Sequence, residues 1–257
     1  MNRIRKAFSA GKAFIPFITG GYPDLETTEK LIIALDEAGA DLIEIGIPFS
    51  DPVAEGPVIE AADEIALKAG CTADKLFETV ARVRDKVSAS LLFMTYYNPV
   101  FAYGVQAFVD KCVECGIEGL IVPDLPYEER DELLEPLKSR GLELISLIAP
   151  TSEARIATIA KNSGGFLYCV SSLGVTGERS EISDCARQMV EQARRVTDIP
   201  CAIGFGISTP DQAREMAAYA DGVIIGSAIV RLIAEHGKDC VQSVSDFAKS
   251  VKDAITS

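Results

Sequence analysis

Several residue types and patterns are scarce in this sequence, and their scarcity narrows what the chain can do. It has one histidine, His236, which we expect to be a solvated residue near the C-terminus of a helix. A Ser-His-Asp mechanism and a histidine-rich metal site are therefore disfavoured. No apolar run approaches the ~18 residues of a membrane-spanning helix. The N-terminal stretch is basic but lacks the apolar core and cleavage pattern of a signal peptide, so we expect a cytoplasmic protein.

Positive charge is also in short supply. The chain has 25 Lys and Arg residues against 38 Asp and Glu residues, a formal net charge of −13. This balance argues against a surface that binds nucleic acid or anionic membranes. The seven cysteines are odd in number and irregularly spaced, which indicates reduced thiols. Cys112 and Cys115 form a lone C-x-x-C without a second pair or a nearby histidine, so we expect them to pack in the core.

Apolar, β-branched runs alternate with amphipathic helical patterns along the whole chain. The expected strands span Phe14–Thr19, Leu42–Ile47, Ser90–Thr95, Gly119–Val122, Leu144–Ile148, Phe166–Val170, Ala202–Phe205 and Gly222–Ile225. The expected helices include Leu25–Ala38, Ala73–Val87, Val105–Cys115, Glu128–Ser139, Glu153–Lys161, Ser183–Val196 and Pro210–Tyr219. Asp24, Thr72 and Thr209 are suitable N-caps for three of these helices.

Eight such β-then-α units in about 250 residues predict a (β/α)8 TIM barrel, an α/β fold. An extra N-terminal helix over Arg3–Ala10 precedes the first strand. No linker, charge block or low-complexity segment divides the chain, so we expect one TIM-barrel domain over residues 1–257. A doubly wound open sheet is the alternative, and it is disfavoured because no G-x-G-x-x-G follows the first strand.

Glu44 places a carboxylate inside the apolar strand expected over Leu42–Ile47. Strand side chains alternate between two faces, so the three isoleucines of this strand share one face and Glu44 points to the other. If the isoleucines pack against helices, Glu44 points into the barrel interior. Burial there should raise the pKa of its carboxyl toward neutrality. A general acid/base that works near pH 7 needs such a pKa.

The loops that follow the strands are the expected location of the active site in this fold. The loop after the second strand runs from Pro48 to Pro57 and carries a further carboxylate, Glu55. The loop over Ser171–Ser180 is long, polar and rich in small residues. Such a composition suits a mobile lid, with an ordinary surface loop as the alternative.

Glycines follow the seventh and eighth strands, where this fold often binds phosphate. Gly204, Gly206 and Gly226 would let backbone N–H groups approach an anion, and a short helix beginning near Ser227 would direct its positive end toward it. Tight-turn packing is the alternative explanation for these glycines. The sequence therefore predicts a barrel enzyme that acts on a phosphorylated small molecule, with carboxylates and a tyrosine as proton-transfer groups.

The motifs of the strand-2 loop are more specific than the fold. Glu44-x-Gly-x-Pro-Phe-Ser-Asp-Pro followed by Ala54-Glu55-Gly56-Pro57 resembles the signature of the tryptophan synthase α subunit family. Further motifs of that family follow in the same order along nearly the whole chain: Pro16-Phe17-x-Thr19-x-Gly21, Tyr97-Asn98-Pro99, Asp124-x-Pro126, Gly174-Val175-Thr176-Gly177, Gly204-Phe205-Gly206-Ile207 and Gly226-Ser227-Ala228.

The resemblance implies a lyase of the last steps of L-tryptophan biosynthesis. Its reaction is the retro-aldol cleavage of indole-3-glycerol phosphate to indole and glyceraldehyde 3-phosphate. It implies no cofactor in this chain, because indole passes to a β subunit that carries pyridoxal phosphate, within an α2β2 heterotetramer. Glu44 is then the principal acid/base and Glu55 handles the indole N–H. Tyr168 lies beside the acid/base, unless it is only a packed barrel aromatic.

The resemblance also implies the residues that hold the substrate and the partner. Phe14, Ile59 and Met94 would form walls for the indole ring, and Thr176 would bond the loop-2 carboxylate as the strand-6 loop closes. The remaining substrate-binding positions, most of them at the phosphate, are Gly177, Gly204, Phe205, Gly206, Gly226 and Ser227. The exposed loops around Pro52, Asn98 and Pro126 would form the face that docks the β subunit.

Two positions depart from the family pattern. Glu55 stands where many members have Asp, and Glu60 stands where many have Gln. The extra methylene moves the Glu55 carboxylate by about a bond length, and a misplacement of ~1 Å can cost on the order of a hundredfold in rate. An α-like subunit that mainly activates β allosterically is therefore one alternative. Another phosphate-binding barrel, such as a phosphosugar isomerase, is a second.

Overall fold

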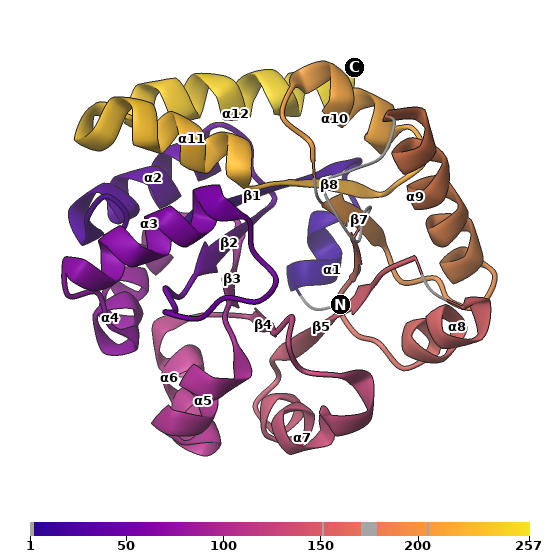
Figure 1. The fold of residues 1–257 in the computed structure, drawn as a ribbon, viewed down its shortest axis with the longest axis horizontal. Coiled ribbons are helices and arrows are strands. Elements are labelled where there is room, and N and C mark those ends of the chain that lie inside the picture. The colour runs from indigo at the N-terminus through magenta and orange to yellow at the C-terminus, as the bar shows by residue number, and fades with distance from the viewer. Residues whose placement is uncertain (1–2, 151, 171–178, 205) are drawn as a thin grey trace.

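The structure is a closed barrel of eight parallel strands, a TIM barrel, in a computed structural model that describes residues 3–150, 152–170, 179–204 and 206–257. The strands pair in sequence order and β8 closes on β1 (Figure 1). They are β1 (Ala13–Thr19), β2 (Leu42–Gly46), β3 (Ser90–Met94), β4 (Gly119–Ile121), β5 (Glu143–Ile148), β6 (Leu167–Val170), β7 (Cys201–Gly204) and β8 (Gly222–Ile225). Each expected strand is confirmed to within one residue at either end.

Helices surround the barrel, and α1 lies apart from them at its centre in Figure 1. The helices are α1 (Arg3–Ala7), α2 (Leu25–Glu37), α3 (Pro57–Lys68), α4 (Ala73–Val83), α5 (Tyr97–Tyr103), α6 (Val105–Cys115), α7 (Asp131–Ser139), α8 (Glu153–Lys161), α9 (Arg179–Arg194), α10 (Pro210–Ala217), α11 (Ser227–His236) and α12 (Val241–Thr256). No helix in the described part of the chain has the length and apolar character needed to cross a membrane. Side chains of Asp24, Thr72 and Thr209 cap α2, α4 and α10, as expected.

Two helices begin inside segments that the sequence motifs suggested were loops. α3 starts at Pro57, which is suited to the first helical position because the missing N–H has no intrahelical acceptor there. α5 contains Asn98 and Pro99, again with the proline in the first turn. The carboxylate of Asp124, from the loop after β4, accepts the Tyr97 N–H at the start of α5 (2.9 Å to Oδ1). Both helices therefore lie directly after strands that carry site residues.

Alternation along the strands divides the barrel into an inner and an outer face. Residues in register on neighbouring parallel strands point the same way, and Glu44 pairs with Phe17 on β1 and Leu92 on β3. The isoleucines of β2 pack in the cluster under the helices, as expected. The inner face is lined by a second cluster that comprises Ala13, Ile15, Leu42, Leu92, Ile121, Ile145, Phe166, Tyr168, Ala202 and Ile224.

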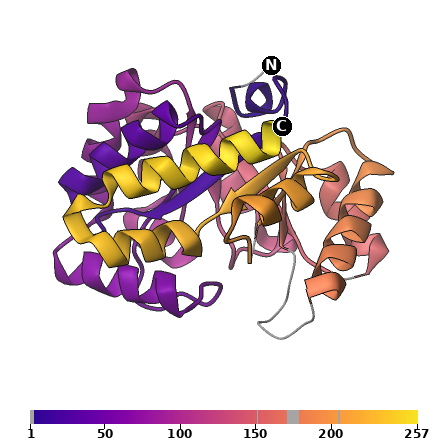
Figure 2. The same cartoon turned by 90° about the horizontal axis from the view of Figure 1, so that it is seen from above.

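One end of the barrel is closed by the N-terminal helix, which is shorter than the expected Arg3–Ala10. Ile4 of α1 is 1% exposed and belongs to the inner cluster. It packs beside Gly119 and Gly165, which lie at the starts of β4 and β6. Figure 2 shows α1 at the edge of the barrel near both termini. Ligands must therefore enter from the opposite end, where the strands finish.

The single histidine lies at a helix end and the cysteines of the C-x-x-C pack in the core, as expected. His236 is the last residue of α11 and is exposed. Cys112 and Cys115 lie on the buried face of α6 within the outer core. Burial raises the pKa of the Cys115 thiol to about 11, which keeps it protonated and unreactive at neutral pH.

Candidate active site

Glu44 is completely buried on β2 and faces the barrel interior. Neither of its carboxyl oxygens has a hydrogen-bond partner among the residues that the structure describes. Burial alone raises the pKa of this carboxyl well above its ordinary value of 4.5. The inward orientation and the raised pKa expected from the strand pattern are therefore confirmed. An unpaired carboxyl in a core is costly, so its presence marks a candidate functional group.

Tyr168 on β6 faces the same interior and is 6% exposed. Burial raises the pKa of its phenol well above the ordinary value, and the negative charge of Glu44 raises it further. A Cβ built on Gly204 would lie 2.6 Å from the Tyr168 hydroxyl. The glycine therefore leaves the room that the phenol occupies. β6 and β7 together hold the tyrosine within the electrostatic influence of Glu44.

Phe14, which was expected to form an aromatic wall of the site, points away from the barrel interior, whereas Phe17 points into it. Phe14 pairs with Val223 near the start of β1 and packs under the helices in the outer cluster. Phe17 pairs with Glu44, and its ring would lie 2.7 Å from a Cβ at Gly46. The two phenylalanines are three positions apart in the strand, so they point to opposite faces. Only Phe17 lies on the inner face, beside the acid.

Met94 and Ile59 lie near the open end of the barrel. Met94 is the last residue of β3, is in register with Gly46, and packs against both core clusters. Ile59 is in the first turn of α3 and is half-buried against the outer core. Apolar side chains from β1, β3 and α3 therefore lie at the end of the strands that carry the acids.

Glu55 is held between α3 and the segment that follows β3. Its neighbour Ala54 donates its N–H to the Tyr96 hydroxyl (3.0 Å), and that hydroxyl also hydrogen-bonds to the Glu55 carboxylate. The other contact of the Glu55 carboxyl is Asp63, an α3 residue that is only 3% exposed. Asp63 Oδ2 accepts the Phe49 N–H (3.3 Å), so α3 is tied to the beginning of the same loop.

The two carboxyls of Glu55 and Asp63 perturb each other. Burial, followed by the charge of Asp63 and a hydrogen bond to it, raises the pKa of Glu55 to about 8. Burial raises the pKa of Asp63 to about 6, against the opposing effects of hydrogen bonds from Phe49 and Glu55. Two carboxyls this close do not ionise independently, because the first negative charge repels the second. Burial and mutual repulsion therefore both favour the protonated form of this pair.

The ends of β7 and β8 supply a site suited to an anion. Gly206 has a φ of +76°, and a Cβ there would meet open space. Gly226 immediately precedes α11, which begins at Ser227 as expected, and both residues are half-buried. The first turn of α11 presents backbone N–H groups and the positive end of the helix dipole. Thr176, Gly177 and Phe205, and nearly all of the expected lid, lie outside the described residues.

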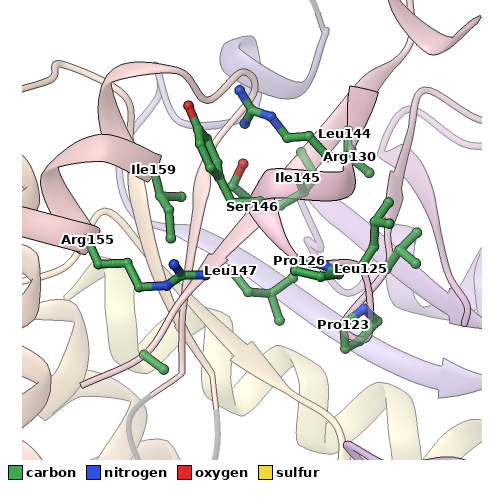
Figure 3. A pocket seen from close by; sticks show the side chains of 13 residues that line it. Pro123, Leu125, Pro126, Arg130, Leu144, Ile145, Ser146, Leu147, Arg155 and Ile159 are labelled. Atoms are coloured by element: carbon green, nitrogen blue, oxygen red, sulfur yellow. The ribbon is translucent and has the colours of Figure 1, made fainter. Parts of the chain in front are cut away.

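A separate cavity of about 200 Å³ lies beside β5, between the loop after β4 and α8 (Figure 3). Two arginines line it, but both already have partners. Arg155 is bonded to the Glu128 carboxylate (2.6 and 3.1 Å), and the Arg130 guanidinium lies 4.0 Å from the ring centre of Tyr127. None of the expected catalytic residues lines this cavity. The acids thus point to the barrel mouth as the candidate site.

A comparison with protein families tests the resemblance found in the sequence motifs. A family profile described as "Tryptophan synthase alpha chain" matches residues 5–256, almost the entire chain. The chain belongs to the tryptophan synthase alpha chain family. The resemblance seen in the strand-2 motif is therefore confirmed over the whole fold.

Individual members of the tryptophan synthase alpha chain family support this assignment over the full length of the chain. The "Tryptophan synthase alpha chain" of Lacticaseibacillus casei is 46% identical over 255 residues, which cover 99% of this chain and 96% of the relative. That of Synechocystis is 47% identical over 264 residues and covers 100% of both chains. The crystal structure of tryptophan synthase subunit alpha from Legionella pneumophila superposes with a TM-score of 0.91 at 36% identity, covering 100% of this chain and 99% of that one.

Three residues that the structure brings to the candidate site were missed from sequence: Phe17, Asp63 and Tyr96. A signal was present for Asp63. It follows Ile59 by four positions and precedes Ala66 by three, so it lies on the apolar face of α3. A carboxylate on a buried helix face is as unusual as one in a buried strand. Tyr96 gave no such signal, because an apolar strand end commonly carries a tyrosine.

Proposed function

We propose that this chain cleaves indole-3-glycerol phosphate to indole and glyceraldehyde 3-phosphate, as a carbon–carbon lyase in the last steps of L-tryptophan biosynthesis. Membership of the tryptophan synthase alpha chain family supports the reaction. The observation that carries it is the isolated, buried Glu44 carboxyl on the inner face of the barrel. A carboxyl whose pKa is raised by burial is a better proton donor near neutral pH, and the carboxylate that it leaves can accept a proton.

In the proposed mechanism Glu44 acts twice. Its protonated carboxyl donates a proton to the indole ring carbon that carries the glycerol phosphate chain, which leaves a cationic ring nitrogen. The resulting carboxylate takes the proton of the adjacent side-chain hydroxyl. The C=O bond of glyceraldehyde 3-phosphate forms, the C–C bond breaks, and its electron pair returns to the ring as neutral indole. Glu44 ends protonated, so no outside acid or base is consumed.

Two further residues support this chemistry in the proposal. Glu55 accepts a hydrogen bond from the indole N–H and stabilises the charge that develops there, for which its carboxyl must be ionised. Tyr168 lies next to the acid/base and positions it, as the effect of the Glu44 charge on the pKa of Tyr168 supports. Phe17, Met94 and Ile59 offer apolar surface to the indole ring.

The phosphate end of the substrate is assigned to the last two strands. Gly206, Gly226 and Ser227 would bind it through backbone N–H groups at the start of α11. Gly204 acts here by giving space to Tyr168, in addition to its place before the phosphate loop. Thr176, Gly177 and Phe205 remain proposed contacts on the basis of the sequence motifs alone.

We infer that the product indole passes to a β subunit with pyridoxal phosphate, in an α2β2 heterotetramer, and that this chain itself carries no cofactor. Val53 in the loop after β2 is 78% exposed and Phe101 on α5 is 63% exposed. Large exposed apolar side chains on the segments that follow two neighbouring strands, β2 and β3, are typical of a docking face. The whole chain would act as one domain, and its free cysteines are consistent with a cytoplasmic location.

An indole-release assay with indole-3-glycerol phosphate tests the proposal, with the chain alone and with a tryptophan synthase β subunit. We expect indole release in both samples and faster release in the complex. A chain that never releases indole, yet stimulates the β reaction when phosphorylated ligand is present, would be an allosteric subunit and would contradict the proposed function.

A further inference from the structure

The loop that carries Glu55 returns into α3 and brings a second carboxyl onto it. Asp63 is 3% exposed and lies one and a half turns into the helix, on its buried face. It bonds the Phe49 N–H at the start of the loop and the Glu55 carboxyl at its end. Asp63 therefore spans the whole loop from the helix side.

The donors around the two carboxyls are too few for both to be ionised. The described donors are the Phe49 N–H, which goes to Asp63, and the Tyr96 hydroxyl, which goes to Glu55. Oε2 of Glu55 is buried and has no donor when both groups are anions. A proton placed between Glu55 and Asp63 supplies the missing hydrogen bond, and it removes the repulsion of two buried like charges.

The surrounding elements reinforce this arrangement. Glu60, on the exposed side of α3, adds negative charge that raises the pKa of both carboxyls. Thr19 of β1 is near enough to lower the pKa of Asp63, although its buried hydroxyl makes no hydrogen bond among the described residues. Cys71 after α3 is near enough for its own pKa to respond to Asp63. The ionisable side chains of α11, which packs on α3, are exposed to solvent: Arg231, Glu235 and His236.

We propose that Asp63 is a positioning residue for Glu55, sharing one proton with it and holding its carboxyl against α3 until the substrate replaces that hydrogen bond. The inference rests on the proposed role of Glu55 as the acceptor of the indole N–H. It adds that the ionisation of Glu55, and hence the lower pH limit of the reaction, is set by a helix residue that does not touch the substrate.

The test is the pH profile of kcat/KM for Asp63→Asn, from pH 5 to pH 9. Asparagine keeps the shape and can still accept the Phe49 N–H, while its amide donates to an ionised Glu55. We expect the acidic limb of the profile to move at least about one pH unit lower, an increase of ~10-fold in relative rate on that limb. The matched control is Glu64→Gln, the exposed neighbour on α3, which should leave the limb in place.

A second measurement needs no activity. Carbon-13 NMR titration of the side-chain carboxyls in the full chain should show Glu55 and Asp63 titrating as a coupled pair. Glu55→Gln should then convert the two-step titration of Asp63 into a single step. Uncoupled titration with ordinary midpoints would overturn the inference. Coupled titration in a chain that releases no indole would leave the pair intact and refute only the proposed function.

An Asp63→Asn variant that folds, retains activity and keeps the acidic limb of the wild type would also overturn it. If Asp63→Asn does not fold, the decision rests on Glu55→Gln, which keeps the native Asp63. A two-step titration of Asp63 that persists in this variant would overturn the inference. A purely structural role for Asp63 predicts lower stability without any change in the pH profile or in either midpoint.

Discussion

Glu44 and Glu55 are eleven residues apart in the sequence, and the barrel holds them in different ways. Glu44 projects from the middle of a strand that is fixed on both sides by backbone pairing with β1 and β3. Glu55 lies in a loop, and side chains from α3 and from the residues after β3 hold it. The first position depends on the backbone of the fold, and the second depends on a few replaceable side chains.

Their acidities differ for the same reason. The pKa of Glu44 is raised by burial alone, so no single neighbour controls it. The pKa of Glu55 is raised by burial together with Asp63 and Glu60, and lowered by Tyr96. Substitutions around Glu44 should therefore change its acidity only by changing how completely it is buried, whereas substitutions of Asp63, Glu60 or Tyr96 should change the acidity of Glu55 directly. The contrast suits a fixed proton donor and an adjustable partner.

Glu44→Gln should have the largest effect on activity. The amide keeps the shape but cannot transfer protons, so indole release should fall on the order of 10²–10⁴-fold, the usual contribution of a general acid/base. Single-turnover cleavage with the β subunit present measures it. Near-normal turnover would show that Glu44 does not transfer a proton in the reaction. Glu55 would then be the only one of these two acids with a catalytic role.

The same variant should be more stable than the wild type at alkaline pH. The pKa of Glu44 is higher in the folded state, so the unfolded chain loses the proton first as pH rises above 4.5. The free energy of unfolding of the wild type therefore falls by about 1.4 kcal/mol per pH unit from this group, until the folded carboxyl also ionises. Urea unfolding at pH 5 and pH 8 should show a stability gain for Glu44→Gln that grows with pH.

Gly204→Ala should displace Tyr168, the neighbour of Glu44, without changing any charge in the site. The new Cβ would lie 2.6 Å from the Tyr168 hydroxyl, so the phenol must move. We expect a loss of roughly 10- to 100-fold in kcat from a displacement of ~1 Å, and a loss of stability of about 1–3 kcal/mol from overpacking. Tyr168→Phe in the same background provides the control, because removing the hydroxyl should restore part of the stability.

The sequence was sufficient for the barrel and for Glu44 because both depend on local periodicity. Alternation in β2 separates the isoleucines from Glu44, and eight β-then-α units leave few other folds. The same argument failed for Phe14, because it cannot tell which of two aromatic residues in β1 lies beside Glu44. That choice depends on the register between β1 and β2, and the structure pairs Phe17 with Glu44.

The surroundings of Glu55 could not be derived in this way. Asp63 and Tyr96 reach it from two elements, and their contacts depend on how α3 and the residues after β3 settle over the barrel mouth. The sequence singled out Glu55 for its extra methylene and left the role of Glu60 open. The structure shows that longer side chain in contact with Asp63, and Glu60 as a charge that acts on both.

Tyr96→Phe should change the position and the pKa of Glu55 and leave Glu44 unaffected. The Ala54 N–H loses its acceptor and Glu55 loses a donor, which should cost about 1–3 kcal/mol at this half-buried loop. Without that donor the pKa of Glu55 should rise further, so the acidic limb of kcat/KM should move to higher pH, opposite to its movement in Asp63→Asn. An unchanged limb would show that Tyr96 supports the loop but not the acid.

Glu55→Asp should have the smallest effect and is the most direct test of the adjustable acid. The shorter side chain at position 55 should no longer contact Asp63, so the pKa of its carboxyl should fall. Turnover should then be unchanged or improved. Steady-state kinetics at pH 6.5 and pH 8 would show the gain mainly at the lower pH. A large loss at both values would mean that Asp63 and Tyr96 place the carboxylate where only glutamate reaches the substrate. In that case Glu55 would be as strictly positioned as Glu44, and the difference between the two acids would lie in their ionisation alone.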